Sequence, residues 1–163
     1  AALEMLNLGD LVRDATVLQR VSSSDTDIDV DVAQANLSFM FDRRLITQAV
    51  TNLVKNAGEA IDSRQQVEGL EKGRILVEAG QTSGIPFIRV TDNGVGLPKE
   101  NRSRLAEPYM TTREKGTGLG LAIVKRVMEE HGGRLRLQDA PGGVGAQVTL
   151  EFAAVSANQL ESV

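Results

Sequence analysis

The chain contains no cysteine, and His131 is the only histidine among its 163 residues. The lack of cysteine excludes disulfide bonds and thiolate metal sites, and a single histidine excludes a cluster of histidine ligands. Aromatic residues make up only 3% of the chain, so its core must be aliphatic. No apolar run reaches the length of about 18 residues that a membrane-spanning helix needs, and no signal peptide opens the chain. We therefore expect a segment that makes no direct contact with a membrane.

The chain also lacks an excess of positive charge. Its formal net charge is −4, and its acidic and basic residues are interspersed without a long block of either sign. Because a nucleic-acid-binding surface needs a basic patch, we expect no nucleic-acid partner. The length suffices for one domain with a substantial core. We predict this domain at residues 8–153, with residues 1–7 as the end of a preceding linker and residues 154–163 as a flexible tail.

The apolar periodicity predicts three main helices and a set of strands. Helices are expected over Leu8–Leu18, Arg43–Ile61 and Leu119–Glu130, with a short fourth helix over Pro98–Leu105. The expected strands are 27–32 paired with Asn36–Phe41, Arg74–Ala79 joined to Pro86–Asp92, and a last hairpin of Arg134–Gln138 and Gln147–Phe152. The stretch Asp62–Gly73 is polar and is predicted to be mobile. These elements indicate an α+β fold, a two-layer α/β sandwich in which a mixed, antiparallel-leaning sheet packs on three helices.

Asn56 is a polar residue at a position where the helix pattern requires an apolar one. When Arg43–Ile61 is stepped at about 100° per residue, the apolar side chains fill one arc. Asn56 falls inside that arc, and Asn52 falls at its edge. A buried amide without a partner costs about 1–3 kcal/mol, so the fold should supply a partner. This partner is either nearby backbone or a bound ligand or ion.

The segment Asp92-Asn93-Gly94-Val95-Gly96 follows a predicted strand. Asn-Gly between strands is a common turn signal. Asp92, however, shares a face with the apolar residues of the preceding strand, so its carboxylate should point inward and require donors. The exocyclic amine of a purine would provide one, and Gly94 and Gly96 would let a flat base approach the backbone. The segment is therefore either a simple turn or one edge of a base-binding site.

A second glycine-rich segment, Gly116-Thr117-Gly118-Leu119-Gly120, leads directly into a predicted helix. Its glycines allow several backbone N–H groups to aim at one point, and the helix dipole favours an anion there, so phosphate is the natural ligand. No Lys-Ser or Lys-Thr follows the last glycine, and no strand precedes the first, which excludes a Walker loop and a Rossmann turn. The alternative is a flexible loop that ends at a helix start.

The loop just before these glycines, Glu107–Lys115, carries two hydroxyls and two cations. Thr111, Thr112, Arg113 and Lys115 suit a lid over a polyphosphate. Viewed in isolation, the same residues fit a solvated surface loop.

The order and wording of these segments resemble the catalytic domain of sensor histidine kinases. Gln48-Ala-Val-Thr-Asn52-Leu-Val-Lys-Asn56-Ala57 is similar to the Asn box, Asp92–Gly96 to the first glycine box, Glu107-Pro-Tyr-Met-Thr-Thr112 to the Phe box, and Gly116–Gly120 to the second glycine box. The resemblance spans about Leu8 to Phe152. The wording of the Phe box and of Glu130-His131-Gly132-Gly133 looks nearest to the nitrogen-regulation branch. The resemblance implies a Bergerat-type (GHKL) ATP-binding fold with the nucleotide between the sheet and the long helix.

The resemblance also implies roles for individual residues toward ATP and Mg²⁺. Asn56, together with Asn52, would hold a Mg²⁺ ion that bridges the phosphates. Asp92 would bind the adenine amine, while Gly94 and Gly96 would make room for the base.

The phosphates would lie in the cradle of Gly116–Gly120. On chemical grounds, Lys55, Arg113 and Lys115 are candidates for stabilising charge on the γ-phosphate.

The sequence departs from the family at two places. Ala106 and Tyr109 stand where the family has phenylalanines, so the docking of the lid should differ. The third glycine region, 142–148, lacks the usual Thr and Phe, and we assign it no contacts.

The residue one helical turn before Asn56 separates the members of the superfamily. ATPases and serine-directed kinases of this fold carry Glu there, because water and hydroxyls need a base. Here that residue is Asn52, which cannot act as a base. A histidine acceptor already offers a lone pair, so the absence of Glu favours phosphoryl transfer to histidine over hydrolysis.

His131 lies at a helix end, where a cation favours the dipole, and we predict that it caps the helix. The phosphoacceptor histidine is therefore expected on a dimerisation domain outside this chain.

The sequence thus predicts the catalytic, ATP-binding domain of a two-component sensor histidine kinase. Its expected partners are its own dimerisation domain and a cognate response regulator. The expected location is the cytoplasmic side of a membrane-anchored bacterial sensor. Two alternatives remain open: an ATP-hydrolysing clamp of the same fold, and a nucleotide-binding regulatory module without catalysis.

Overall fold

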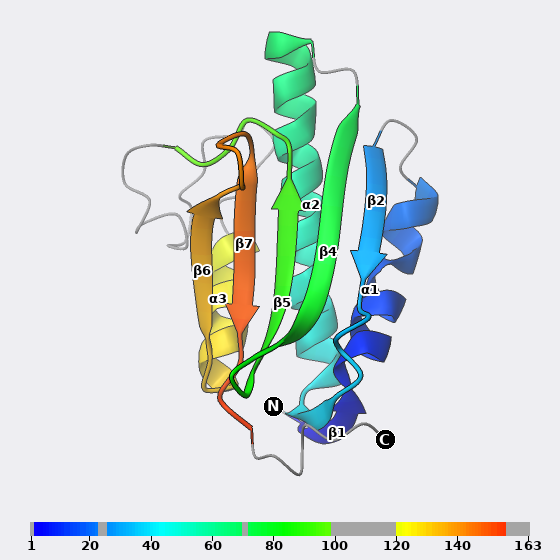
Figure 1. The fold of residues 1–163 in the computed structure, drawn as a ribbon, viewed down its shortest axis with the longest axis vertical. Helices are drawn as coiled ribbons and strands as arrows, with labels where there is room; N and C mark the ends of the chain where they lie inside the picture. The colour runs from blue at the N-terminus through cyan, green and yellow to red at the C-terminus, as the bar shows by residue number, and fades with distance from the viewer. Residues whose placement is uncertain (1, 23–25, 70–71, 99–119, 156–163) are drawn as a thin grey trace.

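A computed structural model describes residues 2–22, 26–69, 72–98 and 120–155 (Figure 1). Within these ranges the elements follow in the order β1 (Glu4–Asn7), α1 (Leu8–Ser22), β2 (Thr26–Asp31), β3 (Ser38–Phe41), α2 (Arg43–Glu68), β4 (Gly73–Thr82), β5 (Ile85–Asp92), α3 (Gly120–Glu130), β6 (Arg134–Asp139) and β7 (Ala146–Glu151).

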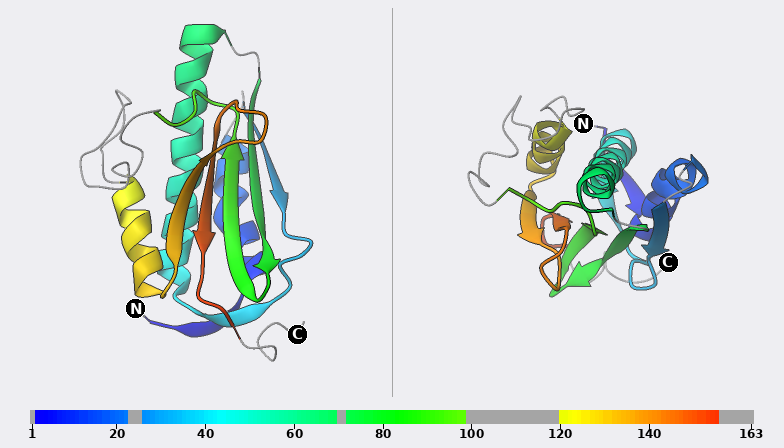
Figure 2. Two further views of the ribbon diagram at one scale, coloured as in Figure 1. Left: turned by 60° about the vertical axis from the view of Figure 1, so that its left-hand side comes forward. Right: turned by 90° about the horizontal axis from the view of Figure 1, so that it is seen from above.

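Five strands form the main sheet, in the order β2-β4-β5-β7-β6. β2 pairs with β4 in parallel, and the remaining neighbours are antiparallel. The described helices α1, α2 and α3 lie on one face of this sheet (Figure 2). The predicted two-layer α+β sandwich, with a mixed sheet on three helices, is therefore confirmed for the part of the chain that the structure describes.

The predicted pairing of 27–32 with 36–41 was wrong. β2 is joined to β4, with Ile28 beside Ile75, and β3 is joined to β1, with Met40 beside Met5. The alternating pattern identified both strands, but it carries no information on which neighbour each strand finds. Parallel neighbours need a long crossover, and α2 lies in the connection between β2 and β4. Residues 4–7, which we expected in a linker, form β1, while the outer bounds of the domain stay a prediction.

The long helix α2 extends further than its apolar pattern indicated. It begins after the N-cap Asp42, whose Oδ1 accepts the N–H of Leu45 at 3.0 Å, and it ends at Gly69 with φ of 70°. The prediction that Asp62–Gly73 is a mobile stretch was wrong over 62–68, which form the last turns of α2. Arginine and glutamine are good helix formers without an apolar stripe, so the helix continues beyond the periodic signal until the left-handed glycine stops it.

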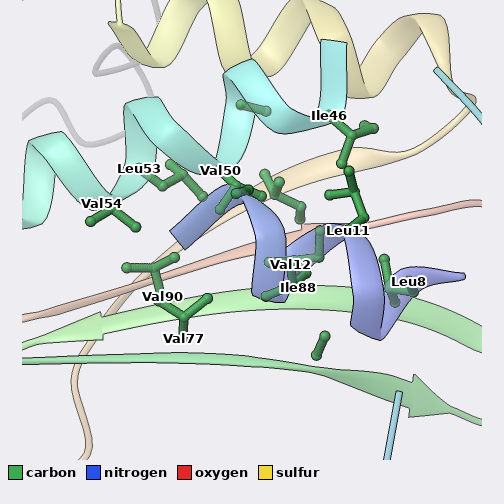
Figure 3. Close-up of a cluster of buried hydrophobic side chains, with 14 of the residues drawn as sticks. Leu8, Leu11, Val12, Ile46, Val50, Leu53, Val54, Val77, Ile88 and Val90 are labelled. Atoms are coloured by element: carbon green, nitrogen blue, oxygen red, sulfur yellow. The ribbon is translucent and has the colours of Figure 1, made fainter. Parts of the chain in front are cut away.

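The core between the sheet and the helices is aliphatic, as predicted. Figure 3 shows side chains of α1 and α2 facing Val77 of β4 and Ile88 and Val90 of β5. The exception is a cluster of Phe39, Phe41 and Phe152 at one end, with ring centroids 4.9–6.1 Å apart. None of the described helices is long and apolar enough to cross a membrane.

Candidate functional site

Asp92 points into the molecule at the end of β5, as the strand pattern predicted. It is 7% exposed. Its Oδ1 accepts the backbone N–H groups of Gly94 at 2.9 Å and Ala146 at 3.3 Å. The first closes the loop that follows β5, and the second comes from the start of β7. The carboxylate therefore organises two loops at one end of the sheet.

The glycines after Asp92 bring this loop against α2. A Cβ added to Gly94 would lie 2.5 Å from the carbonyl carbon of Ala60, and the N–H of Val95 donates to the Ala60 carbonyl at 3.1 Å. Gly96 has φ of 85°, a conformation that favours glycine. Gly94 is thus required by the approach of the loop to the helix, a reason that the sequence did not reveal. Space for a base at Gly94 and Gly96 stays a prediction.

This close approach leads to a test with a matched pair of glycines on or beside α2. We expect Gly94→Ala to lower the free energy of unfolding by about 1–3 kcal/mol, because its methyl group overlaps the backbone of Ala60. We expect Gly58→Ala to raise it by about 1 kcal/mol, because a Cβ at this helical position meets nothing within 4 Å. Urea denaturation of both variants measures the difference. Equal free energies of unfolding would contradict the packing of the loop on α2.

Asn93, which sequence analysis treated only as a turn residue, anchors the loop. Its side-chain Oδ1 accepts the N–H of Arg74 at 2.8 Å, and its Nδ2 donates to the carbonyl of Lys72 at 3.1 Å. Arg64, in the last turns of α2, donates from Nη1 to the Asn93 carbonyl at 2.7 Å. These bonds fix the loop to the end of α2 and the start of β4. No local signal could have identified them, because the partners are distant in sequence.

The third glycine region, to which we assigned no contacts, also reaches the site. Gly145 has φ of 90°, and a Cβ there would overlap the carbonyl oxygen of Asp92. The next residue, Ala146, supplies the N–H that reaches the Asp92 carboxylate. The glycines at 142, 143 and 145 were the available signal. Gly145 and Ala146 contact Asp92 through backbone atoms. The region can therefore contribute to the site although it lacks the Thr and Phe that are usual in the family.

Asn56 lies beside the first residue of α3. It is half-buried, and a Cβ on Gly120 would lie 3.4 Å from its Oδ1 and 3.5 Å from its Nδ2. Asn56 and Ala60 are four residues apart on α2, so they share a face and are separated by about 6 Å along the axis. The helix therefore brings Asn56 close to the loop that Asp92 organises. The start of α3 completes the group.

The structure describes only some of the other predicted site residues. Asn52 is half-buried one turn before Asn56, whereas Lys55 is exposed. Gly120 is at the N-terminus of α3. Thr111, Thr112, Arg113, Lys115, Gly116, Thr117, Gly118 and Leu119 lie outside the described residues, as does most of the short helix predicted over Pro98–Leu105. Within the described ranges, no three His, Asp or Glu side chains come together as a metal site.

Comparison with known proteins agrees with this arrangement. Residues 41–155 match the family described as histidine kinase-, DNA gyrase B- and HSP90-like ATPases. Over 91% of its length the chain is 48% identical to the nitrogen regulation protein NtrY of Azorhizobium caulinodans. Over 77% it is 33% identical to the C4-dicarboxylate transport sensor protein DctB of Rhizobium meliloti. The chain spans 19% of the length of each of these relatives.

Solved structures of histidine kinases have the same fold. The catalytic domain of histidine kinase ThkA is 27% identical, with a TM-score of 0.76, and the match covers 93% of this chain and 97% of that domain. Full-length ShkA, in complex with AMPPNP, is 27% identical with a TM-score of 0.77, and the match covers 96% of this chain and 32% of ShkA. The chain therefore belongs to the family of histidine kinase-, DNA gyrase B- and HSP90-like ATPases, in which it is the catalytic, ATP-binding domain of a two-component sensor histidine kinase.

Proposed function

We propose that this domain binds Mg²⁺-ATP and transfers the γ-phosphate to a histidine on a separate dimerisation domain, from which an aspartate of a response regulator receives it. The observation that supports the proposal is that the Asp92 loop and the N-terminus of α3 meet the same face of α2. The loop organised by Asp92 meets Ala60, and the N-terminus of α3 meets Asn56 one turn away. An inward acid suits the adenine amine, and a helix N-terminus suits phosphate. The complex of ShkA with AMPPNP supports a nucleotide in a fold of this kind.

The identity of residue 52 favours transfer to histidine over hydrolysis. Water and hydroxyl groups need a base to remove their proton, and Asn52, one turn before Asn56, is an amide that cannot act as one. A neutral imidazole offers a lone pair without such help. The site therefore suits an acceptor that is already nucleophilic.

The residues beside α3 fit a magnesium ion that arrives with the nucleotide. Mg²⁺ prefers oxygen ligands, and in nucleotide sites it takes several from phosphates and water and few from the protein. The amide oxygens of Asn56 and Asn52 would hold it, and the lack of a Cβ at Gly120 leaves space beside Asn56. When bound, the ion would neutralise phosphate charge.

The remaining assignments belong to the same proposal. Gly116–Gly120 would cradle the phosphates, with Thr111 and Thr112 in the lid. Lys55, Arg113 and Lys115 would stabilise charge on the γ-phosphate. Since the named relatives are a nitrogen regulation protein and a transport sensor protein, we further propose that this domain lies on the cytoplasmic side of a membrane-anchored bacterial sensor.

Phosphotransfer in trans tests the function. The chain is mixed with the dimerisation domain of its own full-length protein and with γ-labelled ATP, and we expect label on a histidine of that domain. Alone, with or without Asn52→Ala, the chain should release almost no phosphate. Steady phosphate release that Asn52→Ala reduces would instead identify an ATP-hydrolysing clamp. Bound ATP without any labelled histidine would identify a regulatory module.

A further inference from the structure

His131 joins the end of α3 to the beginning of α2. Its Nδ1 lies 2.7 Å from the carbonyl oxygen of Val127, in the last turn of α3. Its Nε2 lies 3.0 Å from the backbone nitrogen of Asp42, the N-cap of α2. The first contact caps α3 at the predicted residue, but it does so through a hydrogen bond and not through the positive charge on which the prediction was based. The second contact attaches one helix to the other.

The two contacts define the protonation state of the ring. A carbonyl can only accept, so Nδ1 carries the proton, and a backbone N–H can only donate, so Nε2 carries a lone pair. The ring must therefore be neutral, in the tautomer with hydrogen on Nδ1. Protonated Nε2 would place an N–H opposite the N–H of Asp42, and the connection to α2 would be lost.

The surroundings of His131 hold both the ring and the chain that follows it. The ring stands at 86° to the ring of Phe152, with centroids 6.2 Å apart. Gly132 has φ of 70°, and a Cβ on Gly133 would overlap the carbonyl oxygen of Glu151 on β7. The sequence His131-Gly132-Gly133 is thus required by geometry, because the chain must turn sharply against β7 while the imidazole reaches α2.

The opposite end of α3 is the end that meets Asn56. α3 runs alongside α2 (Figure 2), and it buries Val124, Val127 and Met128. His131 fixes α3 at one end, and Gly120 lies against Asn56 at the other. Movement of α3 along or about its axis would shift the phosphate-binding end relative to Asn56.

We propose that His131 is a positioning residue for phosphoryl transfer, which in its neutral form fixes the placement of α3, and with it the helix N-terminus at Gly120, relative to Asn56. This inference rests on the proposed function. A displacement of about 1 Å at a reacting centre can reduce rates up to about 100-fold, so a distant residue of this kind can control turnover.

Other charged groups are carried by the elements that meet at this junction. They are Glu4 of β1, Asp42, Arg43 and Arg44 at the start of α2, Glu129 and Glu130 of α3, Arg134 of β6 and Glu151 of β7. The N–H of Leu45 and then that of Ala2 hold the pKa of the Asp42 carboxyl below its ordinary value of 3.8. Carboxylates and guanidinium groups ordinarily keep their charge between about pH 5 and 8.

Two conservative substitutions separate the contacts of His131. In His131→Gln the amide reaches the position of Nε2, so its oxygen can accept the N–H of Asp42. In His131→Asn the amide reaches only the position of Nδ1, so it can bond Val127 but not α2. We expect His131→Asn and His131→Ala to lower the turnover of phosphotransfer about tenfold, with the KM for ATP little changed, because the adenine contacts lie elsewhere. His131→Gln should retain turnover. Lys125→Ala, on the exposed side of α3, is the control.

A purely structural role would give a different result. If the variants lowered Tm but left the turnover of the folded protein unchanged, the proposal would be overturned. It would also be overturned if His131→Asn kept turnover while His131→Gln lost it.

Imidazole ¹⁵N NMR of the unmodified chain tests the geometry without ATP. Because the chain has a single histidine, the ring signals belong to His131, and we expect the Nδ1–H tautomer. The Nε2–H tautomer would refute the link to Asp42 while leaving the proposed kinase function untouched. The expected tautomer without any phosphotransfer would count against the kinase function, and thereby against the positioning role.

Discussion

Asp92→Asn is expected to reduce the affinity for ATP about 10–100-fold, since a hydrogen bond to a charged group contributes about 1.5–3 kcal/mol. The substitution preserves the shape of the side chain. Its amide oxygen can still accept the N–H groups that Gly94 and Ala146 direct at Oδ1, so the two loops should stay in place. Its NH₂ group, however, cannot accept a hydrogen bond from the adenine amine. Isothermal titration calorimetry of both proteins with ATP measures the loss.

A change of purine makes this prediction specific to base recognition. Inosine triphosphate carries a carbonyl oxygen where adenine carries its amine, and that oxygen can accept a hydrogen bond from the new NH₂ group. We expect the unmodified chain to prefer ATP and Asp92→Asn to prefer inosine triphosphate. Asp29→Asn, an exposed position on β2, serves as the matched control and should change neither affinity. An equal loss of affinity for both nucleotides would mean that Asp92 supports the loops without recognising the base.

Asparagine is the more informative replacement because alanine would also disturb the fold. Asp92→Ala would leave the donors of Gly94 and Ala146 buried without their acceptor, and an unsatisfied buried group costs about 1–3 kcal/mol. Loss of ATP binding in that variant could then arise from movement of the loops. Circular dichroism of Asp92→Asn should show an unchanged thermal transition, which would confirm that only recognition has been altered.

The features that sequence could predict are those written in local patterns. The amphipathic arc of α2, the inward position of Asp92 at a strand end, and the start of α3 beside Gly120 each follow from residues close together in the chain. The order of these segments was enough to identify the family. The ligands that these segments bind are a separate question, which calorimetric titration of Asp92→Asn and Asn56→Ala with ATP addresses.

The features that sequence could not predict depend on contacts between distant residues. The acceptor role of Asp92 toward Ala146 joins positions 54 residues apart, and it uses a backbone N–H that every non-proline residue possesses. The bond from Arg64 to the carbonyl of Asn93 is of the same kind. The parallel pairing of β2 with β4 likewise depends on the path of the whole connection, because an alternating strand gives no sign of its neighbour. Where function depends on backbone groups, the side-chain pattern does not indicate which residues are involved.

The link between His131 and Asp42 shows how the two kinds of information combine. The position of a histidine after a helix correctly predicted a cap, but its second nitrogen has a partner that is 89 residues away. The same ring therefore ends one helix and fixes another. A local signal gave the first role, and only the fold gives the second.

Asn56→Ala is expected to abolish the Mg²⁺ dependence of ATP binding and to lower phosphotransfer at least about 100-fold, the loss typical when one group that stabilises transition-state charge is removed. The binding of ATP without Mg²⁺ should be retained, because the proposed base contacts lie at Asp92, at the end of β5, and the loop after Asp92 meets α2 at Ala60, one turn beyond Asn56. Calorimetry with and without Mg²⁺ separates the two effects.

The substitution should leave the fold intact, because Asn56 is half-buried and its side chain faces Gly120, where a smaller residue creates no clash. Gln66→Ala, exposed near the end of α2, is the matched control and should keep the Mg²⁺ dependence. The predictions for Asn56 and Asp92 can be tested separately, because Asn56 is proposed to act on the phosphates and Asp92 on the base. If Asn56→Ala instead weakened ATP equally with and without Mg²⁺, the amide would act on the nucleotide directly, and the ion would have to be held by other residues.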